Sequence, residues 1–176
     1  METKTILVAL ITTTVIATGC GNTYKDVQNE CIYKAAKTAS LEAYEQVYGD
    51  ESPLTEDTKA DIKQTPIYLV GHDDLAQECM VSAPHHAAGC NFYGEIYIGL
   101  DWYHPDTKDF VESTQKDRLG VVCHEVMHQL EYNQNPTNKV NDIDRWDFYH
   151  TDPKIWQIAL PIAQELANDL AAGCSK

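Results

Sequence analysis

The stretch that decides the fold is LGVVCHEVMHQL at residues 119–130. Its apolar side chains recur at helical spacing and form one stripe: Leu119, Val122, Val126 and Leu130. Just upstream, Thr114 and Asp117 resemble a capping box, with Asp in place of the usual Glu, and a polar run around Pro136 would end the helix. The pattern therefore predicts a largely buried helix over about residues 113–132.

The same stretch contains the motif H-E-x-x-H at residues 124–128. On a helix, His124 and His128 lie on one face, so both imidazoles can bind a single metal ion. Glu125 would then lie beside the open position of the metal, where it can take a proton from metal-bound water. The alternative is a surface helix with two solvated histidines. Because a mostly buried helix needs a reason to carry three ionisable side chains, we expect a zinc site here.

One further metal ligand is expected outside the helix, because a catalytic zinc usually has three protein ligands and one open position. His150 is the preferred residue, since it lies 22 residues after His128 and just before a predicted final helix. Four acidic residues remain as alternatives: Asp142, Asp144, Asp147 and Glu165.

The remaining patterns predict a single α+β domain over residues 20–176. Helical spacing of apolar residues recurs in two further segments, at 24–48 and 153–172. Short runs of branched and aromatic residues predict strands at 66–70 and 93–100. The other segments are predicted to be a polar stretch after residue 48, a loop with some helix at 71–92, a connecting loop at 101–112 and a polar loop up to about residue 150.

A strand followed by an H-E-x-x-H helix resembles the arrangement in the zincin metalloproteases. The run HTDPKIW at residues 150–156 also resembles the segment after the motif in SprT-like and related small zincins, where an aromatic residue follows a third histidine. The resemblance covers only these two segments. It implies a small sheet whose edge strand packs on the active helix, with N- and C-terminal helices on its flanks. In zincins this edge binds an extended peptide, and we expect residues 93–100 to be the edge, the alternative being a purely structural strand.

The resemblance implies a zinc metallopeptidase that hydrolyses peptide bonds by Glu125-assisted attack of a zinc-bound water. Zn²⁺ would be held by His124, His128 and His150, and the partner would be a peptide or protein substrate. One alternative is a non-enzymatic envelope lipoprotein that binds a peptide or cell-wall partner and has a structural or degenerate metal site. Another is a zinc amidase that acts on cell-wall peptides. An intact Glu125 favours the enzyme, because a binding protein has no chemical need for a base there.

The N-terminus has the features of an export signal. Residues 6–17 form an apolar, threonine-rich run that is too short to span a membrane. The next residues, Ala17-Thr18-Gly19-Cys20, resemble a bacterial lipobox, which implies a signal peptide over 1–19 and a lipid anchor on Cys20. An ordinary cleaved signal peptide is the alternative. We therefore expect an exported protein of the bacterial cell envelope, held by its lipid in the outer membrane if the source is Gram-negative.

The net charge limits the kinds of partner, and the cysteines can form disulfides if the protein is exported. The net charge of −14 argues against nucleic acid as a partner. Outside the cytoplasm cysteines can oxidise, and the preferred pairs are Cys79 with Cys90 and Cys31 with Cys174. Cys123 would then be a free, buried thiol in the active helix.

Overall fold

The computed structural model describes residues 24–49, 51, 53–79, 88–92, 94–104, 106–134, 150 and 152–175. These residues form an α+β structure, which confirms the predicted class. The helices are α1 (Cys31–Tyr48), α2 (Glu56–Gln64), α3 (His72–Glu78), α4 (Gln115–Gln134), the π-helical turn η2 (Ile155–Ala159), α5 (Leu160–Ala172) and the terminal turn η3 (Gly173–Ser175). The strands are β1 (Lys25–Asp26), β2 (Ile67–Val70), β3 (Gly89–Phe92), β4 (Glu95–Gly99), β5 (Asp101–His104) and β6 (Asp109–Glu112).

The predicted signal peptide over 1–19 and the predicted lipidation residue Cys20 lie outside the described residues. Among the helices that are described, none combines the length and the apolar character needed to cross a membrane.

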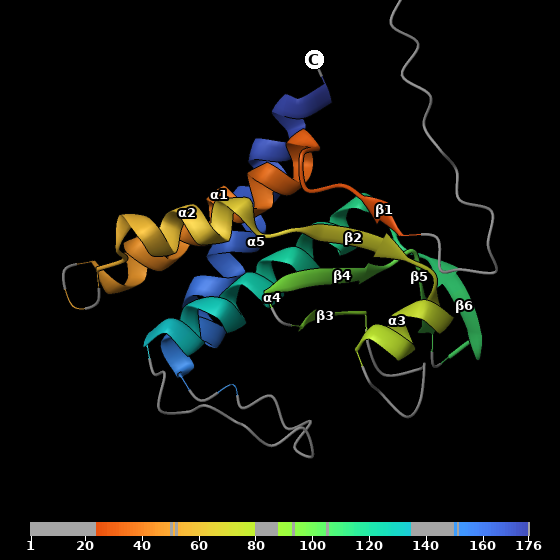
Figure 1. Ribbon diagram of the computed structural model, residues 1–176. Coiled ribbons are helices and arrows are strands. Elements are labelled where there is room, and N and C mark those ends of the chain that lie inside the picture. The colour runs from red at the N-terminus through yellow and green to blue at the C-terminus, as the bar shows by residue number, and fades with distance from the viewer. Residues whose placement is uncertain are drawn as a thin grey trace, which may run out of the picture.

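Four strands form one mixed sheet in the order β1-β2-β4-β3 (Figure 1). β2 and β4 are parallel, and the two outer strands run antiparallel to their neighbours. Side chains alternate along a strand, so the pairs Ile67↔Ile96 and Leu69↔Ile98 place four apolar side chains on one face of the sheet. These side chains pack with those of α1, α4 and α5 in the main core, so this face of the sheet packs against the apolar face of α4.

Helix α4 agrees with the sequence-based prediction at both its start and its buried face. The Thr114 hydroxyl accepts a hydrogen bond from the Asp117 backbone N–H at 3.2 Å, and the Asp117 carboxylate accepts one from the Thr114 N–H at 3.0 Å. This reciprocal pair is the predicted capping box. The predicted apolar stripe is fully buried in the main core: Leu119, Val122, Val126 and Leu130.

The strand predicted within residues 93–100 is present as β4, but the prediction that it forms the edge of the sheet was wrong. Within the described residues the segment 93–100 contains β4, which lies inside the sheet between β2 and β3. The edge on this side is β3, in a region predicted as loop and helix. Its sequence GCNF has no strand-like alternation, and its pairing comes instead from the tight turn at Gly94, where φ is +84°, which folds it back onto β4.

Three other segments also differ from the predictions. The polar stretch after residue 48 contains α2, whose N-cap is the Thr55 side chain and whose buried side chain is Ile62, so its apolar periodicity is weak. The predicted connecting loop at 101–112 is instead the β5–β6 hairpin. Helix α1 begins at Cys31 and not at residue 24, because Lys25 and Asp26 pair with β2 as strand β1.

The predicted final helix is interrupted near its start. Residues Ile155–Ala159 form a π-helical turn, in which the Leu160 N–H donates to the Ile155 carbonyl, and α5 follows directly. Pro161 has no backbone N–H, so the regular α-helical pattern cannot run through it. The turn places Ile155 and Ala159 in the core next to α1 and α4.

The structure contains both preferred disulfides. Cys31–Cys174 joins the first turn of α1 to the C-terminal turn, and these two ends lie side by side in Figure 1. Cys79–Cys90 joins the end of α3 to strand β3. Among the described cysteines, Cys123 is free and fully buried, as predicted. The two bridges therefore connect the start of α1 to the turn η3 and the end of α3 to the sheet edge, and neither involves α4.

Candidate metal centre

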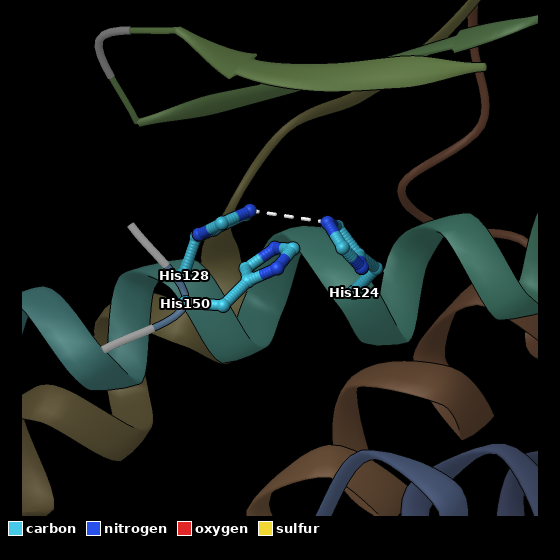
Figure 2. A group of neighbouring side chains, drawn as sticks. All are labelled: His124, His128 and His150. Carbon is cyan, nitrogen blue, oxygen red and sulfur yellow. Dashed lines mark hydrogen bonds between the residues drawn. The ribbon is translucent and has the colours of Figure 1, made fainter. Parts of the chain in front are cut away.

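Three histidines converge on one side of α4. His124 and His128 project from α4, and His150 lies just before η2. One nitrogen from each ring lies within 4.8 Å of the others, and the Nε2 atoms of His124 and His128 are 3.1 Å apart. Figure 2 shows the three imidazoles pointing toward one another on the side of α4 that faces the β3–β4 hairpin. The structure therefore brings together the three residues that the sequence favoured as metal ligands.

The structure describes one of the four alternative ligands and does not place it in the histidine group. Glu165 is exposed on α5 and does not belong to the histidine group. Asp142, Asp144 and Asp147 lie outside the described residues. Among the described residues the group has three members, all imidazoles, and this donor set suits Zn²⁺ with one position left for water or substrate.

Burial gives two of the histidines the protonation state that a metal requires. Burial and the neighbouring His150 lower the pKa of His124 to about 4. Burial, together with His124 and His150, lowers the pKa of His128 to about 3. Both rings are therefore neutral at pH 7, and neutral imidazole is the form that binds zinc. The cluster can accept a cation without first losing protons from these two rings.

Glu125 lies on α4 and contacts the edge strand β3. Its side chain is only 5 % exposed, and burial raises its pKa to about 8, which a hydrogen bond to the backbone of Asn91 partly opposes. The Asn91 side-chain amide also donates to the Glu125 carbonyl at 3.4 Å. A carboxyl group with a pKa near the working pH can both accept and donate a proton.

A glycine allows the edge strand to lie directly on α4. A Cβ atom at Gly89 would be 2.4 Å from Cγ1 of Val121 and 2.7 Å from the carbonyl oxygen of Tyr97. Val121 is one turn before His124 on α4. Gly89 therefore sets the short distance between β3 and the polar face of α4, and this distance brings Asn91 to Glu125.

Two residues of this site were not predicted from the sequence: Asn91, which contacts Glu125, and Glu131, which contacts the segment of His150. Asn91 could not be found, because its approach to Glu125 depends on the unexpected strand β3. Glu131 had a local signal. It lies three residues after His128 and seven after His124, so a helix places it on the same face as both. In the structure its carboxylate binds the segment that carries His150.

No protein-family model, curated protein or solved structure matches this chain.

Proposed function

We propose that this protein is a zinc-dependent peptidase of the zincin type. The observation that carries the proposal is the convergence of His124, His128 and His150, with Glu125 buried on the same helix. Three imidazoles with one open position are typical of a catalytic zinc, whereas structural zinc sites are closed by four protein ligands. Burying a carboxyl group costs free energy, and proteins tolerate this cost most often where the group has a chemical role.

The three histidines would hold the zinc. When bound, zinc polarises the scissile carbonyl and makes water a better nucleophile at neutral pH. Glu125 accepts the proton that the attacking water loses and passes it to the nitrogen of the leaving amine. One water is consumed, the C–N bond breaks, and Glu125 returns to its starting state. Its raised pKa suits both halves of this proton transfer.

The edge strand gives a reason to expect a peptide substrate. In the described part of the chain β3 is the outermost strand of its sheet on the side of α4, and β4 is the strand that it pairs with. An extended peptide can add to such an edge through backbone hydrogen bonds, with little dependence on its side chains. A peptide bound along β3 would run past Asn91 and so past Glu125.

We further propose that the protein is exported and held by a lipid on Cys20 in the cell envelope. The two disulfides support an oxidising location. The anchor itself rests on the sequence around Cys20.

The proposal is tested by measuring zinc content and peptide hydrolysis of the full chain purified in detergent without chelator. We expect about one zinc per chain in the wild type. His150→Ala should lose most of it, while His104→Ala, which removes an exposed histidine of β5, should keep it. Glu125→Gln should keep the zinc and lose at least ~100-fold in turnover, the usual size of general acid–base catalysis.

Two results would overturn the proposal. A wild-type chain without zinc would favour the non-enzymatic lipoprotein with a degenerate site. Full turnover in Glu125→Gln would exclude Glu125 as the base. Zinc retained in His150→Ala would keep the enzyme and move the third ligand to one of the acidic alternatives.

A further inference from the structure

The third histidine comes from a different segment than the other two, and one carboxylate ties that segment to α4. Glu131 Oε2 accepts a hydrogen bond from the indole Nε1–H of Trp156 at 3.0 Å. Glu131 Oε1 accepts one from the backbone N–H of Asp152 at 2.8 Å. Both donors lie within six residues of His150 along the chain. Each oxygen of the carboxylate accepts one of these bonds, so the segment is connected to α4 at two points.

Trp156 also contacts the histidines themselves. Its ring centroid lies 3.9 Å from that of His150, 4.6 Å from that of His128 and 5.0 Å from that of His124. The indole therefore packs against all three imidazoles. The indole is attached to the chain through Cβ and hydrogen-bonded to Glu131 through Nε1–H, so turning the ring to another rotamer would break this hydrogen bond.

Asp152 fixes the same segment from the other side. Its carboxylate accepts hydrogen bonds from the Tyr48 hydroxyl of α1 and from the Lys154 N–H. Its carbonyl accepts one from the Ile155 N–H and thereby starts the turn η2. The backbone two residues after His150 is thus held by α1 and α4 together.

We infer that Glu131 and Trp156 are a positioning pair, which holds His150 beside His124 and His128 in the geometry that a metal needs. The inference rests on the proposed function in taking these histidines as the zinc ligands. Both residues act through the histidines: Glu131 holds the segment of His150, and Trp156 packs against all three rings. Groups that orient metal ligands in this way commonly contribute 10–100-fold to metal affinity.

The chemistry of the pair predicts which substitutions should matter. Gln at position 131 keeps the size of the side chain, but its amide has one oxygen for two N–H donors, so one of the two bonds is lost. Phe at position 156 keeps a ring against the histidines and loses the N–H. Because both changes break the same connection, their effects should not multiply in the double variant. Glu42 is exposed on α1, so Glu42→Gln removes the same charge away from the site.

The test is the zinc affinity of the full chain in detergent, measured by competition with a chelator. We expect Glu131→Gln and Trp156→Phe each to weaken zinc binding about 10-fold or more, and Glu42→Gln to leave it unchanged. The visible spectrum of bound Co²⁺ should change in both variants, because the third imidazole no longer holds its place. A general loss of stability would reduce the folded fraction and leave the spectrum of bound cobalt unchanged.

Wild-type affinity and an unchanged cobalt spectrum in both variants would overturn the inference and leave the proposed function intact. If the wild type binds no zinc, the proposed function fails, and the pair is judged in the metal-free protein by proton NMR. The Trp156→Phe spectrum identifies the indole N–H signal of Trp156. Loss of the contact between the His150 and Trp156 rings in Glu131→Gln supports the pair, and its persistence overturns it.

Discussion

The two faces of helix α4 differ in burial and in their consequences for stability: the apolar face is fully buried, and the polar face combines a buried Glu125 with two half-buried histidines. One face is the apolar stripe, in which Leu119, Val122, Val126 and Leu130 are at most 1 % exposed. The other carries His124, Glu125 and His128. Burial lowers the pKa of both histidines and raises that of Glu125, so it disfavours the charged form of all three. The apolar face stabilises the fold, whereas the polar face destabilises it. Residues that violate the packing rules in this way are expected at functional sites.

The largest expected change in stability comes from breaking the apolar face. Leu130→Ala removes a fully buried side chain from the main core and should lower the free energy of unfolding by about 2–5 kcal/mol. Denaturant unfolding of the metal-free protein measures this. Leu170→Ala on α5, where the side chain is 42 % exposed, is the matched control and should change little. Equal losses in the two variants would contradict the assignment of the core.

A substitution on the polar face should instead raise the free energy of unfolding. Burial raises the folded-state pKa of Glu125 from 4.5 to about 8, so between these two pH values the folded protein keeps a proton that the unfolded chain releases, and the free energy of unfolding falls progressively from pH 4.5 to pH 8. Gln is neutral throughout. In metal-free protein Glu125→Gln should therefore be more stable than wild type by roughly 3 kcal/mol at pH 7, with almost no difference near pH 4.5.

The measurement for this second prediction is chemical unfolding between pH 4.5 and pH 8 with a chelator present. Glu42→Gln, at an exposed position of α1, is the control and should follow the wild-type curve. If the free energy of unfolding of Glu125→Gln varied with pH in the same way as that of wild type, burial would not raise the pKa of Glu125.

The smallest expected effect concerns the contact between the polar face and the edge strand. Gly89→Ala adds a methyl group that meets Val121 and the Tyr97 carbonyl, and it should cost about 1–3 kcal/mol of stability. Val121→Ala in the same chain should restore part of this, since only the carbonyl contact remains. Gly173→Ala is the control, because a Cβ there meets no atom within 4 Å. Thermal unfolding at equal ionic strength compares the three.

Local patterns in the sequence were sufficient for some elements and not for others. The capping box, the apolar stripe and the spacing of His124 and His128 all belong to one helix, so a 3.6-residue period contains the information. β3 and α2 have few apolar side chains and weak periodicity. The position of β3 depends on its pairing with β4, and that of α2 on its packing against α1. The β5–β6 hairpin was likewise not predicted. Its turn has Lys108 at positive φ, where hairpin turns usually have glycine or asparagine.

The sequence by itself determined the α+β class, helix α4 with the residues that start it, and the two histidines that share its face. It also favoured His150 and the two disulfide pairs without giving the distances between them. Tertiary structure alone decided which strand forms the edge, how Gly89 and Asn91 approach Glu125, and how Glu131 and Trp156 hold the segment of His150 against α4. The physical reason is range: a helix repeats its geometry every few residues, whereas these contacts join segments that meet only when the whole core has packed.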